Sequence, residues 1–347
     1  MEESFAMTGG QGQYSYVRNS DIQKRLAKST TTLLVEQIAE NLEVGNAASS
    51  VFTIADLGCS TGPNTFAAVE NIMEAVAHKY EIEGHANHLL EFHILFNDRI
   101  SNDFNTLFAN IPANKKYFAA GVPGSFHGRL FPKATLDFVY SALSLHWLSK
   151  APQELGDLDS PACNRGRIYY NNAPKEVAEA YYSQFSKDME SFLSARAEEV
   201  IPGGLMALLF SGRPSGTLAS QCSPGPVFRA LESCLLDMVN EGTISSDKVD
   251  SFNLPIYGPS VDEMETLIKN NGCFGIVGMV LQPPLTGLSV LTTEECRSTH
   301  ENLIRKHFGD EIIEQLFQRY AMKVADHPLS TAGELAGQMC VFLKRKA

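Results

Sequence analysis

Short apolar runs alternate with amphipathic stretches along most of this chain. Four runs have the composition of buried strands, and they lie at residues 51–57, 89–98, 136–149 and 203–212. A shorter apolar segment within 116–132 leads into a glycine-rich loop. The stretches 65–80 and 175–200 repeat their apolar residues with the period of an α-helix. Because strands that alternate with helices build a mostly parallel sheet, we expect an α/β fold.

The second half of the chain adds strands and extra helices. The β-rich runs 273–281 and 339–346 could pair as a closing hairpin, although they are far apart in the sequence. Segments 226–242, 260–271 and 294–325 show helical spacing of apolar residues. These helices exceed what two sheet faces need, so we expect a helical cap over a ligand cleft.

Residues 51–64, VFTIADLGCSTGPN, combine a buried strand, a glycine turn and a helix start. Glycines let a ligand approach the backbone, and free N–H groups at a helix start suit a carboxylate or a polar ligand edge. Gly58 and Gly62 match neither the dinucleotide pattern G-x-G-x-x-G nor the phosphate loop. A cofactor without pyrophosphate fits better, and S-adenosylmethionine is the natural candidate. An ordinary strand-to-helix turn is the alternative.

Further candidate residues follow the ends of the other strands. Asp98 closes the second run, where an acid binds ribose hydroxyls in nucleotide-binding sheets; it could instead cap the next helix. Ser125 and Phe126 could hold an adenine ring or simply turn a loop. His146 and Trp147 follow a third strand, where the indole N–H could donate to a substrate oxygen or the pair could pack in the core.

The composition narrows the class of partner. A net charge of −12 opposes a nucleic-acid surface, which needs clustered Lys and Arg. No apolar stretch is long enough to span a bilayer, and the acidic N-terminus lacks the apolar core of a signal peptide. Seven cysteines are scattered singly, which suggests reduced thiols in a cytoplasmic protein. For Cys59, in the glycine turn, we expect a packing role.

Seven segments in one order resemble the plant SABATH methyltransferases, which include salicylate, benzoate, jasmonate, indole-acetate, loganate and farnesoate carboxyl methyltransferases and caffeine-pathway N-methyltransferases. The segments are MTGGQGQYSYVRNSDIQ, IADLGCSTGPNTF, FNDRISNDFNTLF, YFAAGVPGSFHGRLFP, SLHWLSKAP, NRGRIYY and VDSFNLPIYGPS. The resemblance implies a Rossmann-like methyltransferase sheet of about seven strands with a helical cap over the active site. It also implies S-adenosylmethionine as cofactor, a small carboxylic acid as substrate, and a homodimer.

The same resemblance implies roles for single residues. Gln23 and Trp147 would hydrogen-bond the substrate carboxylate, and His146 beside them is the third catalytic candidate. The implied cofactor contacts are Tyr16, Asp56, Gly58, Cys59, Asn64, Asp98, Arg99, Ser125 and Phe126. A structural magnesium ion is implied as well. Its oxygen ligands would be Asn164, Asp250, the backbone carbonyl of Phe252, and Asn253.

Departures from the family pattern guide the substrate prediction. Arg99 stands where many members have leucine, Leu143 replaces a common tyrosine, and His146 stands where the floral salicylate type has methionine. Loganate enzymes look to have histidine and glutamine at the positions of Phe228 and Ile256, which argues against a heavily hydroxylated glucoside. We expect an apolar or aromatic acid. The expected pocket comprises Gln23, Leu143, His146, Trp147, Val227, Phe228 and Ile256.

We therefore expect one methyltransferase unit over residues 1–347. Its core would comprise 30–150, 175–215 and 270–347, and its cap mainly 1–29, 151–174, 216–269 and part of 290–325. A carboxylate is ionised at neutral pH, so an in-line SN2 transfer to a methyl ester needs no general base. The alternatives are N-methylation of a xanthine-like heterocycle, a non-catalytic ligand-binding relative, and a nucleic-acid methyltransferase, which the net charge opposes.

Overall fold

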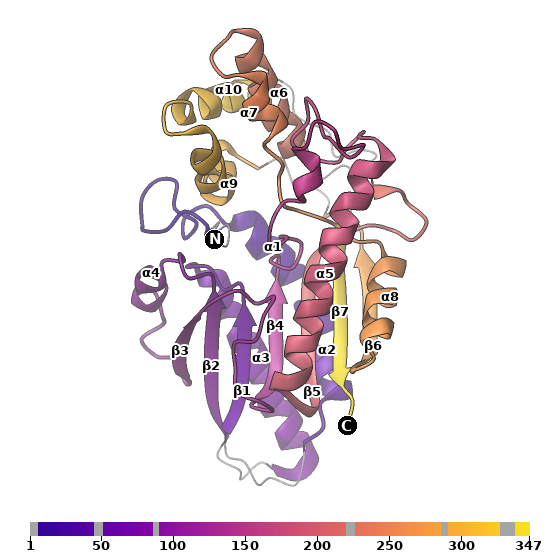
Figure 1. Cartoon of the computed structure of the whole chain (residues 1–347). Coiled ribbons are helices and arrows are strands. Elements are labelled where there is room, and N and C mark those ends of the chain that lie inside the picture. The colour runs from indigo at the N-terminus through magenta and orange to yellow at the C-terminus, as the bar shows by residue number, and fades with distance from the viewer. Residues whose placement is uncertain (1–5, 45–50, 86–89, 220–225, 286–290, 327–336) are drawn as a thin grey trace.

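A seven-stranded sheet with the order β3-β2-β1-β4-β5-β7-β6 forms the centre of the molecule (Figure 1). The computed structural model describes residues 6–44, 51–85, 90–219, 226–285, 291–326 and 337–347. The strands are β1 (Val51–Leu57), β2 (Glu91–Asp98), β3 (Phe118–Pro123), β4 (Leu136–Ala142), β5 (Val200–Gly212), β6 (Phe274–Gln282) and β7 (Gly337–Arg345). Strands β1 to β5 are parallel. The expected α/β fold and strand number are confirmed.

The last two strands pair as the sequence predicts. β7 runs antiparallel to both β5 and β6, and Met279 of β6 lies opposite Val341. Two details differ from the expectation. The second apolar run begins at Leu89, which lies outside the described residues, whereas β2 begins at Glu91. The helical stretch 294–325 divides in two at Gly309, whose φ of 97° ends the first helix.

Both faces of the sheet are buried, because successive residues of a strand point to opposite sides. In β5, Met206 and Leu208 join the apolar core of one face, and Leu205 and Ala207 join that of the other. α5 (Lys175–Glu199) and α8 (Val261–Asn271) cover the first face. α2 (Thr31–Asn41) and α3 (Pro63–Tyr80) cover the second, behind the sheet in Figure 1.

Short elements lie close to the ends of these strands and helices. α1 (Asp21–Ser29) contacts α2 and α3, and α4 (Phe104–Ala109) follows β2. The segment after α3 starts with a π-helical turn, Glu81–His85. A 3-10 turn, Gln153–Leu155, follows β4. α3 begins with Pro63 at its first position, where a missing N–H and a fixed φ suit a helix start.

Four helices lie together beyond the carboxyl ends of the parallel strands, at the top of Figure 1. They are α6 (Pro226–Asn240), α7 (Ser246–Asp250), α9 (Thr293–Phe308) and α10 (Ile313–Asp326), here called the helical end. α10 contacts α6 and α9, and α6 contacts α7. The division of the chain into core and cap stays a prediction.

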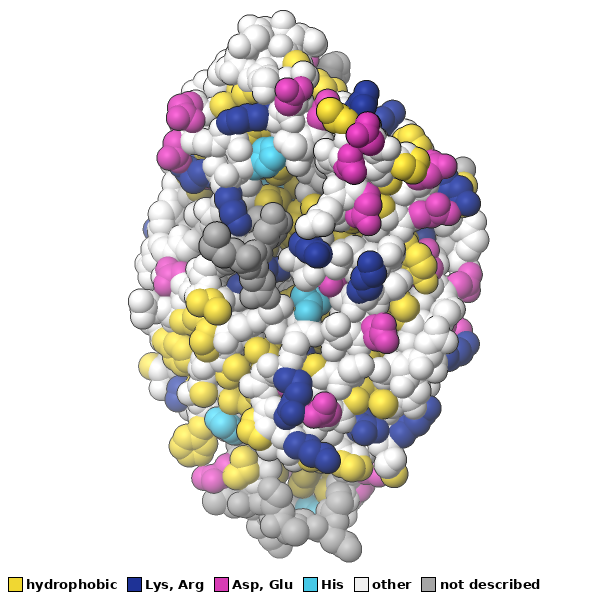
Figure 2. All heavy atoms as spheres, in the orientation of Figure 1, with side chains coloured by type: hydrophobic (Ala, Val, Ile, Leu, Met, Phe, Trp, Pro, Cys, Tyr) yellow, Lys and Arg dark blue, Asp and Glu magenta, His cyan; other side chains and the backbone are white. Residues whose placement is uncertain are grey.

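The charged side chains and the length of the described helices both bear on the question of a membrane span. On the face that Figure 2 shows, Lys and Arg side chains are interspersed with Asp and Glu. Within the described ranges, every helix is too short or too polar to cross a bilayer.

Candidate active site

The loop from β1 to α3 lies against the loop that follows β4. Gly58 has a φ of 88°, and a Cβ built on it would lie 2.5 Å from Ser144 Cβ and closer still to Ser144 Oγ. The N–H groups of Gly58 and Cys59 donate to the carbonyl of Asn97, at 2.9 and 3.0 Å. The chain order changes direction between β1 and β4. In open α/β sheets, ligands bind in the crevice at such a point.

Asp98, at the end of β2, organises this loop. Its two carboxylate oxygens accept hydrogen bonds from the backbone N–H of Ser60 and of Arg99, each at 2.7 Å. Burial raises the pKa of Asp98, while both N–H donors lower it. The cap of α4 is Asp103, which accepts from Thr106 N, so the alternative reading of Asp98 as that cap is wrong.

Several polar atoms of the loop are left for a ligand. Ser60 Oγ, Thr61 Oγ1 and Asn102 Oδ1 are buried and have no hydrogen-bond partner among the described residues. Ser60 also has a φ of 49°, unusual for a residue with a Cβ. Since buried polar atoms are normally hydrogen-bonded, these atoms fit a polar cofactor that lies against the backbone.

Two further cofactor candidates are buried beneath the loop. The Thr65 hydroxyl donates to Asp56, and burial raises the pKa of Asp56 to about 7, with a further contribution from Asp98. Burial also raises the pKa of the Cys59 thiol well above its usual range. Cys59 is therefore an uncharged thiol, in agreement with a packing role.

Tyr16 covers the loop from the N-terminal side. A Cβ built on Gly62 would lie 3.4 Å from Cδ1 of the Tyr16 ring. Burial and the nearby Asp98 raise the pKa of Tyr16, which also hydrogen-bonds Asn64. Asn64 Nδ2 donates to the backbone oxygen of Ser20 at 3.1 Å. Four sequence candidates, Tyr16, Asn64, Asp98 and Asp56, thus lie in one neighbourhood.

Residues 6–20, here called the N-terminal segment, contact both the sheet end and the helical end. Gly10 N donates to Asp103 at 2.8 Å, on the β2 side. Thr8 N donates to the carbonyl of Ser298 at 2.9 Å, and the guanidinium of Arg297 stacks 3.7 Å from the centroid of the Tyr14 ring. Both Ser298 and Arg297 belong to α9.

A buried ion pair holds the loop that carries Phe126. Arg196 and Glu199 of α5 have fully buried side chains 2.6 Å apart. Arg196 Nη1 donates to the carbonyl of Phe126 at 2.9 Å, and Glu199 accepts from Leu130 N and Phe131 N at 2.6 and 2.9 Å. The sequence analysis missed this pair, because an Arg and a Glu three residues apart on an amphipathic helix suggest a solvated face.

The Phe126 loop reaches the other strand ends. The Phe126 ring would lie 3.9 Å from a Cβ on Gly58, and Gly124 N donates to the Asp98 carbonyl at 2.9 Å. Ser125 accepts from Gly128 N through its backbone carbonyl at 3.2 Å. The loops after β1, β2 and β3 therefore meet at one edge of the sheet.

Residues 143–148 after β4 are joined to the segment before α8. Leu143 turns the chain with a φ of 56°, a left-handed conformation that is strained for leucine. Leu148 N donates to Pro255 O at 2.7 Å, and Tyr257 N donates to His146 O at 2.8 Å. These bonds flank a bridge between Trp147 and Ile256. The sequence-predicted Trp147 and Ile256 are thus adjacent.

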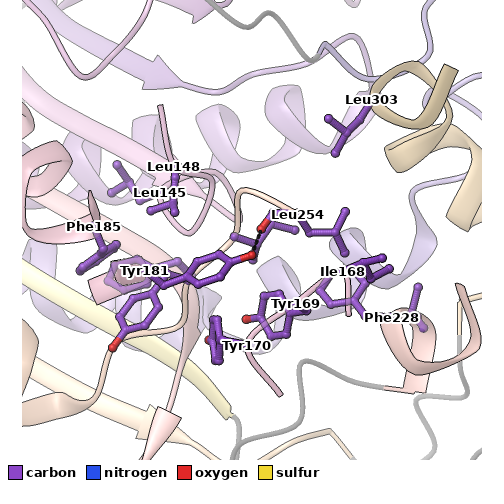
Figure 3. Packing of buried hydrophobic residues seen from close by; sticks show 14 of the residues in the cluster. Leu145, Leu148, Ile168, Tyr169, Tyr170, Tyr181, Phe185, Phe228, Leu254 and Leu303 are labelled. Atoms are coloured by element: carbon purple, nitrogen blue, oxygen red, sulfur yellow. Dashed lines mark hydrogen bonds between the residues drawn. The ribbon is translucent and has the colours of Figure 1, made fainter. Parts of the chain in front are cut away.

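Four aromatic rings from distant parts of the chain pack in a row, here called the ring cluster: Trp147, His300, Phe228 and Tyr169. Consecutive centroids lie 5.9, 5.4 and 5.3 Å apart. Figure 3 shows Phe228 and Tyr169 close together with Ile168 among the buried apolar side chains. His300 was missed from the sequence, since its neighbours in α9 are mostly polar.

Of the remaining pocket candidates, His146 and Val227 lie close to members of the ring cluster. His146 lies 6.1 Å from the Trp147 ring, and burial lowers the pKa of both His146 and His300 to about 4. Val227, next to Phe228, is buried in the same core. Gln23 Oε1 is buried without a hydrogen-bond partner in the described part of the chain.

Three of the four predicted magnesium ligands lie around one loop. Asn164 Nδ2 donates to Asn253 Oδ1 at 2.8 Å, and Gly166 N donates to Asp250 Oδ1 at 2.7 Å. Asn164 Oδ1 is buried and unpartnered among described atoms. An unpartnered amide oxygen is a ligand type that suits a hard cation. Across the described residues, no group of three or more His, Cys, Asp or Glu could hold a metal.

The sheet order, the glycine loop and the ribose-type acid define a Rossmann-like methyltransferase. The chain matches the SAM dependent carboxyl methyltransferase family model over residues 2–346, and it belongs to that family. This confirms the resemblance to the SABATH enzymes, the cofactor S-adenosylmethionine, and carboxyl O-methyltransferase activity. The xanthine alternative is not favoured.

Similar proteins agree with this assignment. Loganic acid O-methyltransferase of Catharanthus roseus is 41% identical, over 99% of this chain and 95% of that protein. Indole-3-acetate O-methyltransferase 1 of Arabidopsis thaliana is 37% identical, over 94% of this chain and 91% of that protein. The solved structure of loganic acid methyltransferase with SAH superposes with a TM-score of 0.93 at 41% identity, covering 98% of this chain and 99% of that one.

Proposed function

We propose that this methyltransferase esterifies a small apolar or aromatic carboxylic acid at the ring cluster. The observation that carries the proposal is that Trp147 forms a bridge with Ile256, and that the ring of His300 contacts the rings of both Trp147 and Phe228. Phe228 and Ile256 are buried apolar side chains. They favour an aromatic or aliphatic body of the acid over a heavily hydroxylated one, because sugar hydroxyls packed against these two side chains would lose their water and gain no partner from them.

The cofactor would lie against the β1 loop. Gly58 would line the cofactor with backbone only, Asp98 would accept from the ribose, and Phe126 and Ser125 would flank the adenine. Asp56, Cys59 and Asn64 would surround the methionine end, with Tyr16 as its cover and Arg99 beside the ribose acid. The backbone N–H groups of Ser60 and Arg99 hold the Asp98 carboxylate at the loop, which supports its role toward the ribose.

The protein's residues bind and orient the acid. Gln23 and the Trp147 indole would donate to the carboxylate oxygens, and the apolar side chains around them would exclude water. When bound, S-adenosylmethionine supplies a sulfonium methyl group: its S–CH3 bond breaks as the carboxylate O–CH3 bond forms, and the electron pair stays on sulfur. Orienting two reactants in this way contributes up to about 7–11 kcal/mol. His146 is uncharged at neutral pH, so it does not act as an acid there.

Methyl transfer from labelled cofactor to a panel of carboxylic acids, with xanthines assayed in parallel, tests the proposal. Gln23→Ala and Trp147→Phe should lower kcat/KM by roughly 10–100-fold while SAH affinity stays unchanged, because each loses one hydrogen bond to a charged group. Lys24→Ala, an exposed neighbour on α1, is the matched control. If both site variants keep wild-type kcat/KM on the best acid, the assignment of Gln23 and Trp147 is wrong.

A magnesium ion at Asn164, Asp250, the Phe252 carbonyl and Asn253 is part of the proposal. The unpartnered Asn164 oxygen supports it. When bound, the ion would link the loop around 164 to the turn after α7. Its role would be structural, because these residues lie outside the ring cluster.

Assembly and location complete the proposal. We infer a homodimer, for which sedimentation should give twice the chain's 38.0 kDa. A cytoplasmic location is supported by the described cysteines, which are all free thiols. The interspersed charges in Figure 2 support a small-molecule partner over nucleic acid.

A further inference from the structure

His300 is a buried polar residue at the centre of the ring cluster that methyl transfer itself does not require. Its side chain is 4% exposed. The imidazole lies between the ring of Trp147, at 5.9 Å, and that of Phe228, at 5.4 Å and nearly perpendicular. It therefore borders the place where the proposed substrate carboxylate meets its apolar body.

The surroundings of His300 fix which ring nitrogen carries hydrogen. Nδ1 lies 3.2 Å from the carbonyl of Cys296 and 2.7 Å from the hydroxyl of Thr299. The Thr299 hydroxyl in turn lies 2.9 Å from the carbonyl of Glu295. Because a carbonyl only accepts, the contact with Cys296 favours the tautomer with hydrogen on Nδ1, and the Thr299 hydroxyl then donates to the Glu295 carbonyl. Nε2 is then a bare acceptor in the neutral ring.

This acceptor has no partner in the described structure. Nε2 of His300 is buried and not hydrogen-bonded. Burial lowers the pKa of His300 to about 4, so the ring is neutral at neutral pH and keeps its lone pair. The other titratable group facing it, His146, is neutral for the same reason and has an unpartnered Nδ1. Buried acceptors in native proteins are normally paired, and a ligand donor would pair this one.

We propose that His300 Nε2 accepts a hydrogen bond from the substrate, so that the enzyme selects acids with a hydroxyl or ring N–H close to the carboxylate. Trp147 would donate to the carboxylate, and its ring centroid lies 5.9 Å from that of His300. The donor would therefore lie on the part of the acid next to the carboxylate. The inference rests on the proposed function and narrows its substrate class. An acid without the donor leaves the acceptor desolvated and unpaired, which is the arrangement that discriminates most strongly.

Paired acids test this. Indole-3-acetate is compared with benzothiophene-3-acetate, which replaces the N–H by sulfur, and salicylate with 2-fluorobenzoate. Wild type should prefer the donor-bearing member of a pair by at least about tenfold in kcat/KM. His300→Leu should bring that ratio to about one, and His300→Gln, whose Oε1 can accept at the Nε2 position, should restore a preference. Melting temperature and SAH affinity verify that both variants are folded.

The outcomes separate this inference from the proposed function. If wild type shows equal kcat/KM within the pairs, if the ratio survives in His300→Leu, or if the best acid of the full panel lacks a hydroxyl and an N–H, the role of His300 is wrong. If no carboxylic acid is methylated, the proposed function fails instead. If His300 were purely structural, its substitution would lower kcat/KM equally for both acids of a pair, and His300→Gln would restore no preference.

Discussion

Replacing Gly58 by alanine should destabilise the protein and weaken cofactor binding. The contacts of Gly58 give the expected loss in free energy of unfolding. Two effects add. A left-handed φ costs an L-residue about 1–2 kcal/mol. Overpacking costs about 1–3 kcal/mol more, because the new Cβ would lie 2.5 Å from Ser144 Cβ. The expected loss in free energy of unfolding is therefore about 2–5 kcal/mol.

Gly84 provides the matched control. Its φ is 89°, nearly that of Gly58, and no described atom lies within 4 Å of a Cβ built on it. Gly84→Ala therefore isolates the backbone cost, including the change in unfolded-chain entropy, which is the same at both sites. The difference between the two variants, about 1–3 kcal/mol, measures the clash.

A double-mutant cycle completes the measurement. Ser144→Gly removes both close atoms, and the nearest remaining neighbour of the Gly58 Cβ is Phe126 Cε1 at 3.9 Å, an ordinary contact. Urea unfolding of wild type, both single variants and the pair should show that Ser144→Gly rescues about 1–3 kcal/mol of the Gly58→Ala loss. SAH affinity by calorimetry should follow the same order. If Gly58→Ala costs no more than Gly84→Ala, or the two substitutions are additive, the close approach of the loops is not what requires glycine.

Three other predictions concern buried charges and the proposed metal. Below the usual His pKa of 6.5 the unfolded chain gains a proton at His300 while the folded protein, with a pKa of about 4, does not. His300 alone should therefore lower stability by up to about 3 kcal/mol from pH 6.5 to 4, and His146, with the same lowered pKa, should add to this fall. His300→Gln should make the urea-derived curve of stability against pH less steep in this range, and a slope equal to that of wild type contradicts the prediction. Glu199→Gln leaves Arg196 buried without its counter-charge and should cost about 3–5 kcal/mol with weaker SAH binding, whereas Glu179→Gln at the exposed Lys175 pair should change neither. Millimolar MgCl2 should raise the Tm of wild type but not of Asp250→Asn, and an equal rise in both would remove Asp250 from the site.

The sequence was sufficient for the sheet and for the loops at its carboxyl edge, because these follow from local pattern. The glycine turn and Asp98 both follow directly after a strand. As expected for neighbouring strand ends, Asp98 accepts a hydrogen bond from Ser60 in that turn, and Gly58 lies against the loop after β4. Pairing of β6 with β7 was also predictable, since both runs are β-rich and follow the parallel strands near the end of the chain. The family resemblance, not periodicity, supplied the roles of Gln23 and Trp147.

Buried polar residues on helices were not predictable, because their burial depends on what packs over them. Arg196 and Glu199 have the spacing of a surface pair, yet the loop after β3 covers them. His300 stands in the polar sequence TEECRSTHENLIRKHF, and only the distant rings of Trp147 and Phe228 make it an interior residue. Both cases need tertiary contacts that no single-chain pattern carries.

The N-terminal segment has an energetic consequence for how the two substrates bind. Tyr16 closes on the cofactor loop, while Thr8 and Tyr14 are held by α9, the helix that carries His300. Ordering the segment for one ligand therefore prepays part of the ordering for the other. Such thermodynamic linkage is reciprocal: whatever factor the acid adds to cofactor affinity, the cofactor adds to acid affinity.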